Sequence, residues 1–418
     1  MARFRHVLKN KNFFCLWVGQ IISQFGDRLN QMALIALVYH KSPGSTIELA
    51  KLLFFIVIPV FVIGPIAGAY VDRWNRKYTM IVSDILRGVL VLLIPFSIIF
   101  LKQTVFIYPL VFIIFSVTRF FLPSKMAIIP SIVSPDQLLV ANSLSDTTRM
   151  IATVIGLGFA GILVKWVGVI GSFYIDSVSF FISALLTAAI VVKEAKPKFK
   201  NGLLVAEEAI KNAMKRSIFA DIKAGFEYLI KLEKIRFVVS ILFLLMSGIG
   251  AIFCVIIVFI QNSFGTITSD IGLLGMFLGI GLFAGTVFYG RVMQNFTKSK
   301  VIFTNLAIIG ASIVAFTVFV KEFQSFLFAS ILSFTIGFFV GPIIVLCNTL
   351  VQEALPEDAR GRVFSSVEAI MHLGFLVFML LTSFLAEFIG NAWILIIIGG
   401  IFSLFGIGGI ILKLKAKN

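Results

Sequence analysis

Long apolar runs separated by short polar segments recur along the whole 418-residue chain. A helix needs about 20 mostly apolar residues to cross the hydrocarbon core of a bilayer, and twelve runs have this length or more. The predicted spans cover residues 13–40, 48–71, 78–101, 105–128, 138–164, 169–192, 236–262, 269–292, 300–320, 324–350, 363–388 and 391–412. The pattern therefore predicts an all-α polytopic membrane protein with twelve transmembrane helices.

A polar and basic segment, residues 193–235, divides the predicted spans into two groups of six. We therefore expect an N-terminal six-helix bundle over residues 1–192 and a C-terminal one over residues 236–418. Within the segment, residues 219–232 place five apolar side chains on one helical face. This arrangement predicts an amphipathic helix that lies on the cytoplasmic surface of the membrane.

A turn motif repeats between the two halves. Pro135-Asp136 follows the fourth span, and Pro356-Glu357 follows the tenth span at an offset of 221 residues. Two parallel repeats of this kind are typical of transporters whose substrate site lies between the repeats. The sequence therefore predicts two pseudo-symmetric six-helix bundles.

Composition and charge placement define the class and the orientation. Apolar residues make up 59% of the chain and charged residues 13%, about half the charged share of a soluble protein. The net charge of +16 would suggest a nucleic-acid partner if the protein were soluble. However, segments on one side of the spans hold 27 of the 36 Lys and Arg residues, and the opposite loops hold five. This bias predicts that both termini are cytoplasmic, and it favours the lipid bilayer over nucleic acid as the partner.

The first span contains charged residues near its middle, where each one costs about 2.5–3.5 kcal/mol. We expect Asp27 to be the site of a proton or of a substrate cation, with Arg28 beside it. Asn30 and Gln31 follow one turn later and could line the same cavity or hold helices together. An alternative stays open, in which Asp27 forms a structural ion pair with Arg28 or with Arg119 of the fourth span.

Two further pairs have the spacing that places side chains on one helical face. These pairs, Asp84 with Arg87 and Asp146 with Arg149, are expected near the cytoplasmic ends of their spans, in an inner gate network. Glu368 of span 11 is expected to make a gate contact as well.

Asp176 in the sixth span lies close in sequence to Ser177 and Ser179. This carboxyl group could take part in a proton relay, or it could be a hydrogen-bonded structural group within the bundle.

Small residues recur within the spans and favour close helix packing. The pairs are Gly64/Gly68, Gly275/Gly279, Gly281/Gly285 and Gly337/Gly341. Span 5 also contains Gly156, Gly158 and Gly161, which formally match a dinucleotide-binding pattern. That reading is excluded, because no strand precedes the glycines and they lie inside a predicted membrane helix.

The loop after span 2 reads GAYVDRWNRK and resembles the signature loop of the major facilitator superfamily. The matching positions are Gly68, Asp72, Arg73, Arg76 and Lys77. Asn75 stands where the family usually has Gly, which is a mild departure because Asn tolerates the left-handed backbone conformation. The resemblance implies two bundles that alternate in access, with this loop acting as a latch on the cytoplasmic side.

Further segments, residues 20–34, 121–144, 173–186 and 341–364, resemble the macrolide-efflux-type drug:proton antiporters and related siderophore exporters. The resemblance implies a monomer that exports drugs in exchange for protons. Arg119 resembles an arginine that tunes proton transfer in this family, or else it is a snorkelling anchor. The three glycines of span 5 resemble a degraded antiporter signature that lacks the family's proline. Residues 23–27 also resemble lysophospholipid transporters.

The chain lacks the sequence motifs of several other functions. The chain has no phosphate-binding loop for ATP, so no ATPase function is expected. No H-E-x-x-H motif or paired cysteine spacing suggests a metal, and no nucleophile elbow suggests a hydrolase. We therefore expect no enzyme activity, no cofactor and no ATPase partner, with a proton or substrate gradient as the energy source.

These observations favour a secondary active transporter in the cell (inner) membrane. Its expected substrate is a small hydrophobic or amphipathic compound, such as a drug or macrolide. One alternative is a lysophospholipid or other lipid-like substrate moved without strict proton coupling. A second alternative, from another class, is a membrane scaffold or receptor that does not transport.

Overall fold

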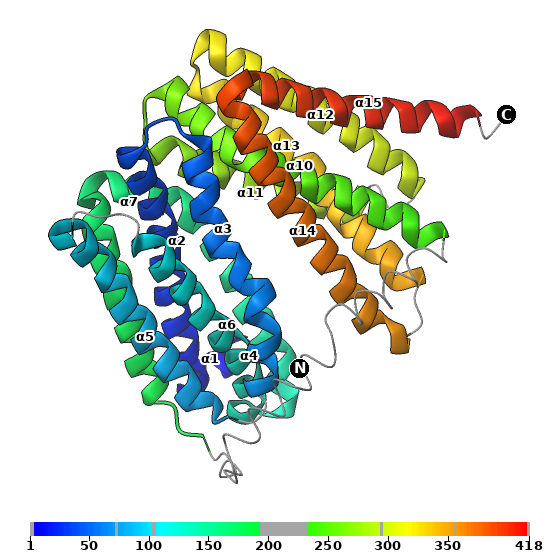
Figure 1. The fold of residues 1–418 in the computed structure, drawn as a ribbon. Helices are drawn as coiled ribbons and strands as arrows, with labels where there is room; N and C mark the ends of the chain where they lie inside the picture. The colour runs from blue at the N-terminus through cyan, green and yellow to red at the C-terminus, as the bar shows by residue number, and fades with distance from the viewer. Residues whose placement is uncertain are drawn as a thin grey trace. The chain divides into compact units, whose positions relative to one another are not determined.

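The computed structural model describes residues 4–71, 74–101, 106–192, 233–292, 296–354 and 357–415, which are almost entirely helical (Figure 1). The helices of the first half are α1 (Phe4–Lys9), α2 (Lys11–Lys41), α3 (Thr46–Val62), α4 (Gly64–Val71), α5 (Arg76–Phe96), α6 (Ile107–Ile132) and α7 (Leu138–Ala188). Two short segments, the π-helix Ser97–Leu101 and the 3-10 helix Pro135–Gln137, extend α5 and precede α7. The helices of the second half are α10 (Glu233–Phe264), α11 (Ser269–Val292), α12 (Lys298–Phe323), α13 (Phe326–Ala354), α14 (Glu357–Ile389) and α15 (Asn391–Lys415).

The all-α polytopic fold is confirmed. Nine helices among the described residues are long and apolar enough to cross a membrane. The longest, α7, covers the two predicted spans 138–164 and 169–192, because Gly168 adopts a φ of 77° and breaks the helix between them. A left-handed backbone angle is easy only for glycine, so this residue allows the chain to reverse direction without a long loop. The predicted span 48–71 is likewise divided, into α3 and α4.

The described residues group into two compact units. One consists of those within Met1–Leu37 and Leu52–Ser217, and the other of those within Val38–Lys51 and Ile218–Asn418. The predicted surface helix at 219–232 lies outside the described residues.

The grouping of Val38–Lys51 with the second unit was not anticipated from the sequence. Its physical basis is a set of hydrogen bonds to α14. Thr46 Oγ1 donates to the carbonyl of Ser383 at 2.6 Å, and Ser45 Oγ donates to Glu387 Oε1 at 2.8 Å. Glu387 Oε1 also accepts from the backbone N–H of Ile47 at 3.4 Å, which satisfies one of the free donors at the start of α3.

The first unit is organised around α5, which packs against both α6 and α7. Ser177 Oγ on α7 donates to the carbonyl of Gly88 on α5 at 2.8 Å. The helix α2 is fixed to the first part of α7, since Gln20 Nε2 donates to the carbonyl of Ser145 at 2.9 Å and Trp17 Nε1 donates to Thr148 Oγ1 at 2.8 Å. These contacts bring the polar residues of α2 next to those of α5 and α7.

In the second unit, α11 and α13 approach closely through glycines, as predicted. A Cβ atom added at Gly281 or Gly285 would collide with the backbone of α13, and one added at Gly337 or Gly341 would collide with α11. Each helix therefore supplies two small residues to the same interface. At Gly64 the described residues show no such contact, since none of their atoms outside its own helix lies within 4 Å of the position its Cβ would take.

We predict that Gly285→Ala destabilises the second unit. The new methyl group would press on the backbone carbonyl of Phe338, which cannot rotate away. Overpacking of this kind costs about 1–3 kcal/mol. The measurement is the thermal unfolding midpoint in detergent. Gly408→Ala is the control, because no atom of the described residues outside its own helix lies within 4 Å of that added Cβ. Equal midpoints for the two variants would contradict the packing described for α11 and α13.

Candidate functional site

Asp27 lies near the middle of α2 and is half-buried. It interacts electrostatically with three arginines, most strongly with Arg87, then with Arg28 and Arg119. The ion pairs formed by the described residues do not include Asp27. Among the described residues, Asp27 therefore interacts with three guanidinium groups and with the carboxyl group of Asp176, and it forms an ion pair with none of them.

Arg28 forms a hydrogen bond within its own helix. Its Nη1 donates to Gln31 Oε1 at 2.8 Å, one turn further along α2. Its side-chain stem packs against Gly156 on α7, where an added Cβ would lie 3.2 Å from Arg28 Cγ. The first glycine of span 5 thus makes room for this arginine. Gly158 and Gly161 are buried on the same helix.

Asp176 on α7 is fully buried and is tied to α2. Its Oδ2 accepts from Asn30 Nδ2 at 2.7 Å, and Ser179 Oγ donates to its backbone carbonyl at 2.7 Å. Gly26 allows the two helices to meet, because an added Cβ would collide with Ser179 and Asp176. Asp176 also interacts electrostatically with Asp27 and Arg87, so the two carboxyl groups belong to one network.

Arg87 and Asp84 form an ion pair on α5 that is almost completely removed from solvent, with exposed fractions of 2% and 0%. The guanidinium Cζ lies 4.4 Å from the ring centroid of Phe121 on α6 and 4.3 Å from that of Phe180 on α7. The spacing of this pair suggested a cytoplasmic gate, and that role stays a prediction. Arg87 also interacts electrostatically with Asp27 of α2. Arg119 on α6 completes the set, with its Nε donating to the carbonyl of Phe115 at 3.4 Å and an electrostatic interaction with Asp27.

The other residues expected at the cytoplasmic gate lie apart from this network. Asp146 and Arg149 form an exposed ion pair of 3.2 Å on α7. Arg76 Nη1 donates to the carbonyl of Ala127 at 2.9 Å, and Lys77 Nζ donates to that of Ala188 at 2.7 Å. Their role in gating stays a prediction.

Four more positions were expected at the cytoplasmic gate. Gly68 lies in α4, and Glu368 is exposed on α14. Asp72 and Arg73 lie outside the described residues.

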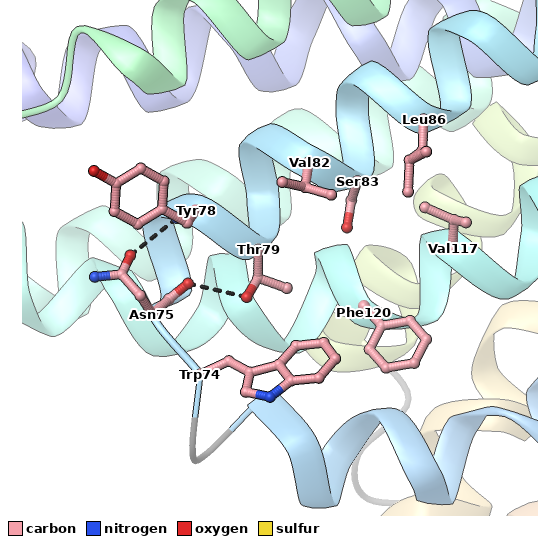
Figure 2. Close-up of a pocket in the computed structure, with 9 residues that line it drawn as sticks. All are labelled: Trp74, Asn75, Tyr78, Thr79, Val82, Ser83, Leu86, Val117 and Phe120. Carbon is pink, nitrogen blue, oxygen red and sulfur yellow. Dashed lines mark hydrogen bonds between the residues drawn. The ribbon is translucent and has the colours of Figure 1, made fainter. Parts of the chain in front are cut away.

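A separate cavity of about 700 Å³ opens on another face of α5. Figure 2 shows Val117 and Phe120 of α6 opposite residues of α5, with Trp74 beside Phe120. The rings of Trp74 and Phe120 stack with centroids 5.9 Å apart. The complete lining consists of Trp74, Asn75, Tyr78, Thr79, Val82, Ser83, Leu86, Val117 and Phe120. Its surface is mostly apolar and suits a hydrophobic group.

The sequence interpretation missed Phe121 and Phe180. The chain has 46 phenylalanines, and no sequence pattern distinguishes these two from those that pack helices or contact lipid. Their contact with Arg87 depends on how α6 and α7 are rotated around α5, which hydropathy does not define. No cluster of three or more His, Cys, Asp or Glu side chains suited to a metal ion occurs in the described ranges.

Comparisons with known proteins agree with this architecture. The sequence profile of a family described as transmembrane secretion effectors matches residues 5–417. An uncharacterized MFS-type transporter of Bacillus subtilis, YfiS, is 24% identical over 429 residues, which cover 98% of this chain and 94% of the relative. Macrolide efflux protein A of Streptococcus pyogenes is 24% identical over 403 residues, covering 92% of each chain. The crystal structure of a bacterial homologue of the iron transporter ferroportin, in an inward-facing state, is 14% identical with a TM-score of 0.67 and covers 95% of this chain and 98% of its own.

We predict that Asn30→Ala lowers the stability of the first unit, because it leaves Asp176 Oδ2 buried without its hydrogen-bond donor. Such a loss costs about 1–3 kcal/mol. The thermal unfolding midpoint in detergent measures the effect. Asn142→Ala is the control, because Asn142 is exposed on α7. A midpoint for Asn30→Ala no lower than that of the control would show that this bond does not hold α2 to α7.

Proposed function

The chain belongs to the transmembrane secretion effector family of major facilitator transporters, and on that premise we propose that it exports a small hydrophobic or amphipathic compound in exchange for protons. It is a multi-pass membrane transporter and not an enzyme. The export direction, the proton coupling and the substrate class belong to the proposal.

The observation that carries the proposal is the environment of Asp27. A carboxyl group at this depth costs several kcal/mol and persists only where it has a use. Asp27 has no ion-pair partner among the described residues, although three arginines act on it. A carboxylate locked in an ion pair would resist protonation, whereas this one can change its charge during a cycle.

In the proposed cycle, Asp27 takes up a proton from the outer side and releases it to the cytoplasm. Substrate moves outward as the protein alternates between its two open states, so that the proton gradient drives export. No nucleotide or cofactor is needed for these steps. Close to Asp27 in sequence, Arg28 donates a hydrogen bond to Gln31 on the same helix, and Asn30 donates one to Asp176 and so fixes α2 to α7.

The similarity to macrolide efflux protein A supports a substrate of drug or macrolide type. The identity of 24% leaves the substrate class as part of the proposal. The excess of positive charge on one side of the spans supports cytoplasmic termini, and we propose that the protein works as a monomer in the cell membrane.

One observation favours a second candidate, which is transport of a lysophospholipid or another lipid-like compound. The cavity between α5 and α6 is mostly apolar and large enough for a hydrophobic chain. In this case substrate would enter from the bilayer, and strict proton coupling would not be required.

We predict that Asp27→Asn abolishes substrate-driven proton movement, because an amide cannot bind and release a proton. The experiment uses the full chain in liposomes with a lumenal pH dye, with macrolides, lipophilic cations and lysolipids added in turn. Wild-type protein should move protons when a substrate is added.

The matched control is Asp136→Asn, which removes a carboxyl group that is exposed in the turn before α7. This variant should behave as wild type. Full proton coupling in Asp27→Asn would exclude Asp27 as the proton site. Translocation of lysolipid without proton movement would favour the second candidate.

A further inference from the structure

We propose that the cavity between α5 and α6 holds one acyl chain of an anionic phospholipid from the cytoplasmic leaflet, and that this lipid stays bound while a different compound is transported. The inference goes beyond the proposed function and does not depend on proton exchange at Asp27. It rests on the length and lining of the cavity, on the surface of α5 around it and on the charges at its end.

The cavity follows α5 over the depth of about one leaflet. Its lining on this helix runs from Asn75 to Leu86 along one helical face. The steps from residue 75 to residue 86, at 1.5 Å each, extend about 16 Å along the helix axis. The hydrocarbon core of a bilayer is about 30 Å thick, so one leaflet contributes about 15 Å. The length of the cavity therefore suits an acyl chain that lies along α5.

The interior of the cavity suits a hydrocarbon chain. Figure 2 shows Val82 and Leu86 on α5 opposite Val117 on α6. None of the described residues that line the cavity carries a charge. A charged group inside it would lose its water without gaining a partner, which is unfavourable. The charged part of a ligand therefore has to lie outside the cavity.

The polar side chains of the lining lie mainly at the start of α5, and two of them bond to the helix itself. Asn75 Oδ1 accepts from the backbone N–H of Tyr78 at 2.9 Å, and Thr79 Oγ1 donates to the carbonyl of Asn75 at 2.9 Å. Deeper in the cavity, Ser83 contributes a hydroxyl group that is 4% exposed. This polarity places the headgroup end of a lipid beside Asn75 and its chain toward Leu86.

The surface of α5 around the cavity is apolar. After Tyr78, every exposed side chain of this helix is a large hydrophobic one. These residues are Val82, Ile85, Leu86, Val89, Leu93 and Phe96. A path for substrate and water would need polar groups, whereas lipid chains favour a surface of this kind. We therefore expect the cavity to open to the bilayer.

Two amphipathic aromatic residues mark the end of the cavity. Trp74 is 42% exposed and Tyr78 is 66% exposed. The ring of Trp74 stacks on that of Phe120 on α6, with centroids 5.9 Å apart. Tryptophan and tyrosine are enriched at the level of the lipid headgroups. This end of α5 follows the basic loop that the charge bias places in the cytoplasm, so the lipid belongs to the cytoplasmic leaflet.

Two basic residues lie directly after Asn75 and give the headgroup its charge partner. Arg76 Nη1 donates to the carbonyl of Ala127 on α6, and Lys77 Nζ donates to that of Ala188 on α7. Each of these bonds uses one donor, whereas a guanidinium group has five and an ammonium group three. The remaining donors suit the phosphate of an anionic lipid, because charge-assisted hydrogen bonds to phosphate are strong. These cations favour an anionic headgroup over a zwitterionic one.

The first experiment measures the thermal unfolding midpoint of the full-length protein in detergent, with and without phosphatidylglycerol. A ligand that binds the folded protein raises its midpoint. We expect a rise for wild type and none for Leu86→Trp, because the indole ring would occupy the cavity. Val89→Trp is the matched control, because Leu86 and Val89 are both 45% exposed on α5 and only Leu86 lines the cavity. It should show the wild-type rise.

Each variant is compared with its own midpoint without lipid, so a change in its basal stability does not affect the result. If Leu86→Trp does not fold, Val117→Trp narrows the same cavity from α6.

The second experiment tests the headgroup. Arg76→Gln and Lys77→Gln should each raise the dissociation constant for phosphatidylglycerol by about fivefold, the effect of one basic residue near an anionic membrane surface. Lys300→Gln is the control, because Lys300 is an exposed residue of α12 in the other unit. Phosphatidylcholine should bind more weakly than phosphatidylglycerol, and glycerol 3-phosphate, which has no acyl chain, should not raise the midpoint.

The third experiment locates the chain. Phosphatidylglycerol with a photoreactive group on one acyl chain is added to the full-length protein, and the labelled peptides are identified by mass spectrometry. We expect labels on Val82 or Leu86 of α5 and on Val117 or Phe120 of α6, and we expect their loss in Leu86→Trp.

Four results would overturn the inference. They are an equal rise in midpoint for Leu86→Trp and Val89→Trp, equal binding of phosphatidylcholine, a full response to glycerol 3-phosphate, and labelling away from the cavity. Movement of phosphatidylglycerol between the leaflets of liposomes that is lost in Leu86→Trp would also overturn it, because the lipid would then be the transported substrate.

These failures are separate from failure of the proposed function. Proton movement in Asp27→Asn tests the proposed function and does not involve the lining of this cavity. If Asp27→Asn couples normally while phosphatidylglycerol still stabilises wild type and Val89→Trp alone, the proposed function fails and the lipid site stands.

Discussion

Burial of one guanidinium group constrains how the helices of the first unit pack. Arg87 is 2% exposed, and outside water its charge must be balanced by nearby groups. Asp84 balances it directly, while Phe121 and Phe180 cover its two faces. These residues come from α5, α6 and α7, so the compensation of one charge requires that the three helices pack in a single arrangement.

The surroundings of Asp27 depend on how α2 packs against these helices. The helix α2 is positioned against α7 by bonds at both ends of its polar stretch, from Gln20 to Ser145 and from Asn30 to Asp176. This places Asp27 within the field of Arg87 without giving it an ion pair of its own. The first unit thus combines a fixed, buried guanidinium with a carboxyl group that has no ion-pair partner among the described residues.

The elements could be predicted from sequence because a bilayer imposes a minimum length on each apolar run. The break at Gly168 falls between two predicted spans, 138–164 and 169–192, where Lys165 and Gly168 interrupt the apolar run. Asp27 was recognisable as a candidate site because charge is costly within a span. The environment of Arg87 was not predictable, because it depends on the rotation of three helices. The docking of Val38–Lys51 on α14 depends equally on contacts between segments far apart in sequence.

The proposed function depends on proton exchange at Asp27 when substrate binds. The most direct test is to add a macrolide to the purified protein in unbuffered detergent solution and to record the pH change. We expect wild-type protein to release protons on binding, and we expect Asp27→Asn to bind the macrolide without release. Proton release of equal size from both proteins would contradict this expectation.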